Sequence, residues 1–277
     1  MVTEITRRSF AIGAPAAGVC TFLAIDSSAA AIQSGSSTEP AASIYEAFPS
    51  QDPAIVRETV ATSHGNFKRV RELVEASPAL AKANWDWGYG DWESALGAAS
   101  HTGNRDIATF LIEHGARPNI FSAAMFGQLD VVKALVAASP GVQRIHGPHG
   151  ITLLSHARAG GELASEVVKY LETLGDADVG YQTETLTDDE KKSYLGVYYF
   201  GTGDLDHLEI YEQRRNKALM IKRSGQRFGR TLFYLGLHEF HPAGAPFVRI
   251  KFALEGNQVV EVTIRDPEVI VTGRIIS

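Results

Sequence analysis

The feature that most constrains this chain is a short helical hairpin pattern that recurs along much of its length. In the clearest copy, residues 94–119, two apolar faces at helical spacing lie on either side of Gly103. Gly103 and Gly115 stand where the two helices are expected to end, a position at which glycine readily adopts the left-handed conformation. A hairpin this thin cannot bury its apolar side alone, so the pattern predicts a stack of such hairpins.

Three more copies appear when the glycine between the helices is used to align the sequence. The aligned residues are Gly65, Gly103, Gly127 and Gly161, separated by 38, 24 and 34 residues. One leucine from each copy is expected to join a continuous apolar seam, namely Leu73, Leu111, Leu135 and Leu171. Four unrelated hairpins are the alternative, but they would not be expected to repeat a glycine at the same place.

The copies resemble the ankyrin repeat, whose period is about 33 residues. The resemblance is strongest at residues 150–154, Gly-Ile-Thr-Leu-Leu, which are similar to the family's Gly-x-Thr-Pro-Leu opening, and at residues 113–119, which are similar to its closing turn. It covers residues 52–180. It implies an α-solenoid of about four helix pairs that presents a concave surface to protein partners and carries no chemistry of its own.

Residues 1–31 resemble a twin-arginine export signal. Paired arginines at positions 7 and 8, with Phe10 two places on, precede a mildly apolar run and then small residues that offer a cleavage site after Ala31. The resemblance implies a periplasmic or otherwise extracytoplasmic location. An uncleaved N-terminal anchor and a lipoprotein signal at Cys20 remain open, but the apolar run is too short to indicate a membrane span.

The composition is that of a soluble globular protein with room for two domains. Of its 277 residues, 44% are apolar and 21% are charged, and the formal net charge of −6 disfavours nucleic acid as a partner. Cys20 is the only cysteine, so a chain cleaved after Ala31 would form no disulfide. Residues 32–51, rich in Ser, Ala and Pro, are predicted to be a linker, and Asp52-Pro53 is typical of a helix start.

A first group of candidate site residues lies in an aromatic and acidic run that takes the place of a projecting finger between helix pairs. All three tryptophans of the chain fall within it. Large amphipathic rings suit a contact surface or a pocket wall, although they could equally cap the first helix pair. The candidates are Trp85, Asp86, Trp87, Tyr89, Asp91, Trp92 and Glu93.

A second group lies in the finger before the fourth copy and on nearby helices. It consists of Arg144, His146 and His149 in the finger, with His101 and His156 on the helices. If the fingers project on one side, the acids of the first group could partner these histidines in a metal or acid–base site. The alternative, hydrogen-bonded turn histidines beside a solvated acidic rim, leads us to predict no metal, cofactor or catalytic residue.

The pattern changes to a period of two in residues 185–277. After a capping-box sequence at Thr187 to Glu190, seven or eight short strands are expected between residues 196 and 271. They predict an antiparallel β-barrel or strongly curled sheet, and their order resembles the lipocalin-like β domains of bacterial exported hydrolases, which implies no activity. A filled interior is expected from the aromatic residues Tyr198, Phe200, Phe233 and Phe252.

The fold class is therefore α+β: an N-terminal solenoid followed by a small barrel. The leading functional hypothesis is an exported binding or scaffold protein that mediates protein–protein interactions in the bacterial envelope. The alternative is a small-ligand-binding protein or enzyme with a site between the Trp-rich and His-bearing fingers. No recognised catalytic motif is present in the sequence. Exposed tryptophans favour the first hypothesis, whereas tryptophans converging with histidines and an acid favour the second.

Overall fold

The structure is a computed structural model that describes residues 50–201, 206–226, 228–267 and 269–275. The export signal at residues 1–31 and nearly all of the linker at residues 32–51 lie outside the described residues. Within the described part of the chain, no helix is both long and apolar enough to span a membrane.

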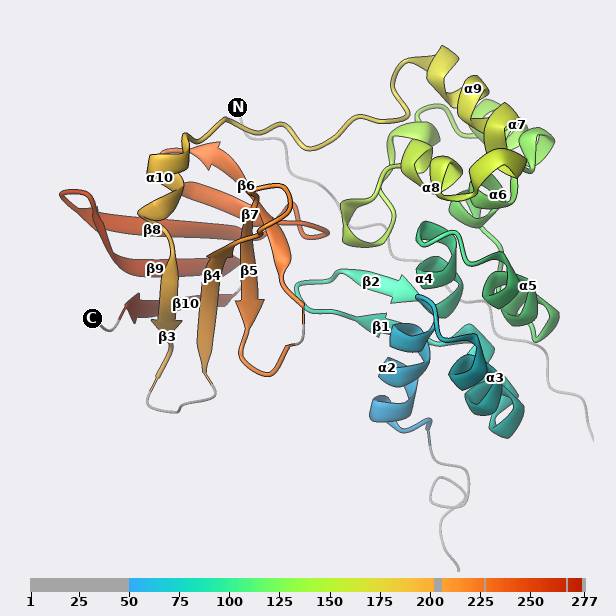
Figure 1. The fold of residues 1–277 in the computed structure, drawn as a ribbon, viewed down its shortest axis with the longest axis horizontal. Coiled ribbons are helices and arrows are strands. Elements are labelled where there is room, and N and C mark those ends of the chain that lie inside the picture. Colours follow the sequence, from blue (N-terminus) through green and yellow to red (C-terminus); the bar gives the residue numbers. More distant parts are fainter. Residues whose placement is uncertain (1–49, 202–205, 227, 268, 276–277) are drawn as a thin grey trace, which may run out of the picture. The chain divides into compact units, whose positions relative to one another are not determined.

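Four pairs of antiparallel helices follow one another from Pro53 (Figure 1). The pairs are α2 (Pro53–Thr62) with α3 (Phe67–Ala76), α4 (Ala95–His101) with α5 (Arg105–Glu113), α6 (Ile120–Phe126) with α7 (Leu129–Ala138), and α8 (Leu153–Ala159) with α9 (Ser165–Leu174). Short 3-10 turns lie between successive helices: η1 (Pro78–Lys82), η2 (Val142–Arg144) and η3 (Pro148–Gly150) between pairs, and η4 (Gly161–Ala164) within the fourth pair.

Three helix ends lie where the sequence predicts them: the start of α2 and the ends of α4 and α5. The Asp52 side chain accepts a hydrogen bond from the Ala54 amide at 2.8 Å, with Pro53 at the first helical position of α2. Gly103 and Gly115 have φ values of +71° and +92°, as expected for glycines that end α4 and α5. Gly65, by contrast, is not among the positive-φ glycines, so the aligned glycine is not left-handed in the first copy.

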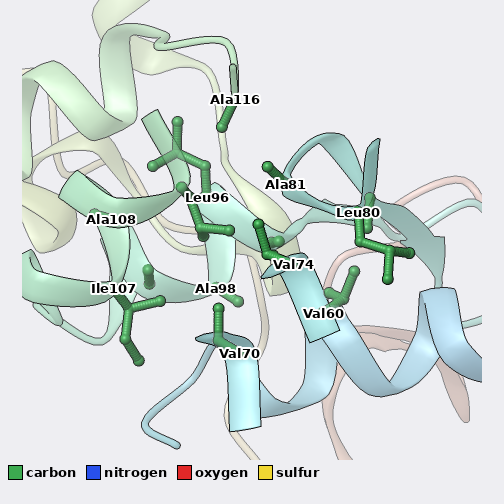
Figure 2. Packing of buried hydrophobic residues seen from close by; sticks show 14 of the residues in the cluster. Val60, Val70, Val74, Leu80, Ala81, Leu96, Ala98, Ile107, Ala108 and Ala116 are labelled. Carbon is green, nitrogen blue, oxygen red and sulfur yellow. The ribbon is translucent and has the colours of Figure 1, made fainter. Parts of the chain in front are cut away.

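The helix pairs stack through the first helix of each, since α2 contacts α4, α4 contacts α6, and α6 contacts α8. Side chains from α2 to α5 form one apolar cluster, which Figure 2 shows around Val70, Val74 and Leu96. Met125 of α6 joins this cluster and Phe126 packs against it, whereas Ile120, Ala123 and Ala124 of α6 form a second cluster with residues of α7 to α9.

Three of the four leucines of the predicted seam are buried, but they lie in two apolar clusters and not in one. Leu73 and Leu111 lie in the first cluster and Leu171 in the second. The prediction for Leu135 is wrong, because its side chain is 36% exposed. On α7 only Val132 is fully buried, although the helix also carries Leu129, Val131, Leu135 and Val136, so it covers the stack with a narrow apolar face.

Residues 196–275 form a closed eight-stranded antiparallel barrel, preceded by helix α10 (Asp188–Lys192). The strand order is β10-β3-β4-β5-β6-β7-β8-β9. Thr187 and Glu190 form the predicted capping box at the start of α10. The strands are β3 (Gly196–Tyr199), β4 (His207–Glu212), β5 (Leu219–Arg223), β6 (Arg230–Gly236), β7 (Glu239–Pro242), β8 (Arg249–Glu255), β9 (Gln258–Asp266) and β10 (Val269–Ile275).

Aromatic side chains fill the barrel, as the sequence predicts, but not all of them are the predicted ones. Tyr198 and Phe252 are buried in its core together with Phe240, and Phe200 packs against that core. Phe233 is the exception. It is only partly buried and packs against Tyr181 and His241 instead.

Candidate functional site at the Trp-rich hairpin

The Trp-rich finger is a two-stranded hairpin, β1 (Asn84–Asp86) and β2 (Trp92–Ser94). Trp85 pairs with Glu93, and Asn84 pairs with Ser94. Because successive side chains of a strand point to opposite faces, Trp85 and Glu93 share one face, which we call the inner face. Asn84, Trp92 and Ser94 share the other, which we call the outer face.

The turn at the tip of the hairpin accounts for Gly88, Gly90 and Asp86 in the Trp-rich finger. Gly88, Tyr89 and Gly90 all have positive φ, and Asp86 accepts a hydrogen bond from the Gly88 amide at 2.7 Å. Tyr89 packs against the barrel core. Asp86 and Tyr89 therefore shape and anchor the turn and contribute no group to the inner face.

On the inner face, Glu93 lies among three histidines from three different helical segments. His101 is the last residue of α4, His64 follows the end of α2, and His149 lies in η3. The distance from His101 Nε2 to Glu93 Oε1 is 2.9 Å, that from His149 Nε2 to Oε1 is 3.4 Å, and that from His64 Nε2 to Oε2 is 3.5 Å. We call these four residues the histidine cluster.

Glu93 is fully buried yet remains ionised. Burial alone would raise the pKa of its carboxyl, but hydrogen bonds with His101 and His149 lower that pKa to about 2. The indole Nε1–H of Trp87 also donates to Glu93 Oε2, at 2.7 Å. The Glu93 carboxylate thus has a donor on each oxygen.

His149 is held by a second acid, Asp91. Asp91 Oδ2 accepts a hydrogen bond from His149 Nδ1 at 2.8 Å, and Oδ1 accepts one from the His149 amide at 2.9 Å. Burial alone would lower the pKa of His149, but the contacts with Asp91 and Glu93 raise it to about 9. The guanidinium of Arg230, on strand β6, lies 3.3 Å from Asp91 Oδ2 and offsets part of the acidic charge.

The outer face borders a groove of about 360 Å³. Trp92 stands at its edge with 62% of its surface exposed. Much of the groove wall is polar, and its lining includes Asn84, Ser94, Asn119, Phe121 and His146. The three tryptophans are thus divided, because Trp85 and Trp87 pack against the helical core as the capping interpretation expects.

The predicted site residues fall into separate places. Glu93, His101 and His149 meet in the histidine cluster, whereas Arg144 pairs with Asp176 at 3.0 Å and does not approach it. His146 bonds the Val179 carbonyl oxygen through Nε2, at 2.8 Å.

His156 is fully buried in α8, outside the histidine cluster. Its Nδ1 lies 2.9 Å from the Thr152 carbonyl oxygen, and burial lowers its pKa to about 4. It therefore stays neutral as a core histidine, although its ring lies 6.3 Å from that of His101.

Sequence reasoning missed His64 as a member of the cluster. A signal was available, because His64 immediately precedes the aligned Gly65 and His101 precedes the aligned Gly103 by two residues. Histidines near the same glycine of successive copies come from equivalent places in stacked hairpins, so they are expected to be neighbours.

A comparison with known protein families finds an ankyrin repeat at residues 91–123, and no curated protein matches the chain. The matched residues contain β2, α4, α5 and the start of α6, so Glu93 and His101 both lie within them. The matched segment is therefore the one that positions half of the histidine cluster. The chain contains an ankyrin repeat.

Proposed function

We propose that this protein is an exported ankyrin-repeat binding protein that holds a protein partner on the outer face of the Trp-rich hairpin. The observation that carries the proposal is Trp92, a large aromatic side chain left 62% exposed beside a groove. Tryptophan is enriched among the residues that dominate binding energy at protein interfaces. An ankyrin repeat at the same place suggests protein–protein interaction independently.

The chemistry of the groove suits a polypeptide. Asn84, Ser94 and Asn119 offer amide and hydroxyl groups next to the indole ring of Trp92. An aromatic anchor surrounded by hydrogen-bonding groups matches the usual interface arrangement of an apolar centre with a polar rim. A peptide segment would satisfy both parts, its side chains against the rings and its backbone against the amides.

The proposed location is outside the cytoplasm, in the bacterial envelope. It is supported by the paired arginines at positions 7 and 8, the apolar run after them and the small residues up to Ala31. The proposed location can be tested by fusing residues 1–35 to a fluorescent protein that fluoresces in the periplasm only if it was exported in the folded state. Replacing both arginines by lysine is expected to abolish export, and unchanged export would rule out the twin-arginine route.

The outer face can be tested by site-specific photo-crosslinking in cells. A photoreactive phenylalanine analogue at position 92 is expected to capture a discrete partner protein. The same analogue at position 163 is the control, because Leu163 is also a large apolar residue, 74% exposed, but does not line the groove. Identical products at both positions, or none at position 92, would contradict a partner on the outer face.

A second candidate function, binding of a small ligand between the two fingers, is favoured by a different observation. The histidine cluster joins the Trp-rich finger to the His-bearing finger through Glu93 and His149.

A further inference from the structure

We propose that the histidine cluster binds one divalent transition-metal ion, with His64, His101 and His149 supplying three nitrogens and Glu93 supplying oxygen. One ligand atom from each of the four residues lies within 4.8 Å of all the others. The inference does not rest on the proposed protein partner, because none of the four ligands lines the groove; Asp91 borders both the groove and His149 but is not a ligand.

The spacing already approaches that of a coordinated ion. Zinc–nitrogen and zinc–oxygen bonds of about 2.0–2.2 Å place tetrahedral ligand atoms about 3.3 Å apart. The three distances from imidazole Nε2 atoms to Glu93 are 2.9, 3.4 and 3.5 Å. All four ligand atoms lie within 4.8 Å of one another, so an ion at the centre requires side-chain movements that draw them toward tetrahedral spacing.

Hydrogen bonds at the far side of two rings aim their ligand nitrogens inward. The Nδ1 atom of His64 lies 3.0 Å from the Ala61 carbonyl oxygen, which can only accept, so Nδ1 carries the proton. The same reasoning applies to His149, whose Nδ1 donates to Asp91. In each neutral ring the lone pair is then on Nε2, which faces the cluster. Histidine ligands of metal ions are commonly oriented in this way by a carbonyl or carboxylate.

The number of histidines exceeds what a buried carboxylate needs. One protonated imidazole is enough to neutralise Glu93, and further protons in the cluster repel one another. The ring centroids of His64 and His101 lie 4.9 Å apart and those of His101 and His149 lie 5.5 Å apart, so positive charges on these imidazoles would be close enough to repel one another. Metal binding would release the Nε2 proton that His149 carries in the metal-free protein. A cation among the four groups would then attract the lone pairs of the neutral imidazoles and the Glu93 carboxylate together.

The donor set selects the class of metal. Three imidazole nitrogens and one carboxylate oxygen suit zinc, iron, cobalt, nickel and related ions. Calcium and magnesium prefer oxygen ligands throughout. Asp91 completes the arrangement as a carboxylate behind His149, and its side chain is only 2% exposed.

The centre is closed on one side and accessible on the other. The side chains of Glu93 and His101 are 0% and 10% exposed, whereas those of His64 and His149 are 32% and 30% exposed. An ion would enter between His64 and His149 and would carry any water ligand on that side. A partly open site of this kind is typical of metal centres that exchange a ligand.

The test uses the full chain, freed of metal with a chelator and titrated with Co²⁺, whose visible absorption reports nitrogen and oxygen coordination. We expect saturation at one equivalent and displacement of cobalt by Zn²⁺. Addition of Zn²⁺ is expected to shift the Nε2 resonances of His64, His101 and His149 in nitrogen-15 NMR spectra. The His146 resonance is expected to stay unchanged.

Two substitutions separate the ligands from the fold. His101→Ala removes a ligand nitrogen, and Glu93→Gln keeps the shape of the side chain and an oxygen to accept from Trp87. Each is expected to weaken cobalt binding by more than about 100-fold, while Asp91→Asn, which acts through His149, is expected to weaken it about 10–100-fold. His146→Ala is the matched control, a histidine near His149 but outside the cluster, and is expected to bind like the unmodified chain.

The proposal is overturned if the unmodified chain takes up neither Co²⁺ nor Zn²⁺ at one equivalent, or if it binds Ca²⁺ instead. It is also overturned if folded Glu93→Gln and His101→Ala variants bind as tightly as the unmodified chain. Circular dichroism of every variant, recorded before titration, separates loss of a ligand from loss of the fold.

Discussion

Glu93 and His149 hold each other in the charged state against the burial that opposes both charges. In the metal-free protein the pKa of Glu93 is lowered to about 2, and that of His149 is raised to about 9. The stabilisation from Glu93 is present above its ordinary pKa of 4.5 and is lost as the pH falls through about 2. The stabilisation from His149 is present below its ordinary pKa of 6.5 and is lost as the pH rises through about 9.

The first prediction concerns this pH dependence. The free energy of unfolding of the metal-free chain should be highest near pH 6.5. It should fall by about 2 kcal/mol toward pH 9.5, because His149 then loses its proton, and it should also fall toward pH 4.5, because the pKa of buried His156 is lowered to about 4 and its imidazole binds a proton more readily in the unfolded chain. Urea denaturation at several pH values measures it. The charged and titratable groups facing His149 are Asp91, Glu93, His64, His101 and, through Asp91, Arg230.

The control for this prediction is His149→Gln, which keeps a hydrogen-bond donor for Asp91 but cannot titrate. Its unfolding free energy is expected to fall less steeply above pH 6.5 than that of the unmodified chain. Parallel curves for the two proteins would mean that His149 is not the group responsible.

A second prediction at the scale of a residue concerns His156. Its Nε2 is buried without a hydrogen-bond partner, and the Thr152 oxygen that its Nδ1 contacts also accepts the His156 amide. His156→Leu therefore leaves no buried group unpaired and is expected to change the unfolding free energy by less than about 1 kcal/mol. His156→Ala leaves a cavity and is expected to cost about 2–4 kcal/mol. Equal losses for the two variants in urea denaturation would indicate that the imidazole itself is needed.

At the scale of an element, the glycines that follow α5 and α6 matter for two different reasons. Gly127 has a φ of +75°, and a Cβ there would collide with the Leu163 carbonyl oxygen before α9. Gly115 has a φ of +92°, but a Cβ there would meet nothing within 4 Å. The first glycine permits close approach between hairpins, whereas the second serves only the left-handed turn.

The third prediction compares these two glycines. Gly115→Ala is expected to cost about 1–2 kcal/mol of unfolding free energy, the usual penalty of a left-handed non-glycine residue. Gly127→Ala is expected to cost more, because backbone atoms of the neighbouring hairpin must also move. Thermal unfolding of both variants measures the difference, and a smaller loss for Gly127→Ala would contradict the close packing of these hairpins.

The sequence was most informative where structure is local. Period-two alternation predicted seven or eight strands where the barrel has eight, and the capping residues Asp52 and Thr187 located helix starts, because both signals depend on neighbours along the chain. It failed at Leu135 and Phe233, whose exposure depends on which distant element covers them. The histidine cluster shows the same limit, since residues 64, 93, 101 and 149 meet only after three helix pairs have stacked.

At the scale of the whole molecule, stacking turns weak hairpins into a rigid frame for the cluster. The two helical core clusters meet at α6, where Met125 belongs to the first and Ala123 and Ala124 belong to the second. The histidine ligands come from the turns and helix ends of the first, second and fourth pairs. An ion bound there links pairs that are far apart in sequence, so it should oppose the unfolding of the stack as a unit.

The last prediction follows from that linkage. A ligand that binds only the folded chain raises the free energy of unfolding by about 2.7 kcal/mol when its free concentration is 100 times its Kd. For a protein of this size, that increase corresponds to a rise in Tm of about 5–10 °C. Zn²⁺ should therefore raise the Tm of the full chain in a concentration-dependent way, followed by the helical circular dichroism signal. The rise in Tm should vanish in Glu93→Gln, because this substitution removes a ligand of the ion. It should persist in His146→Ala, because His146 is not a ligand. A Tm that rises equally in all three proteins would assign the effect to zinc bound elsewhere.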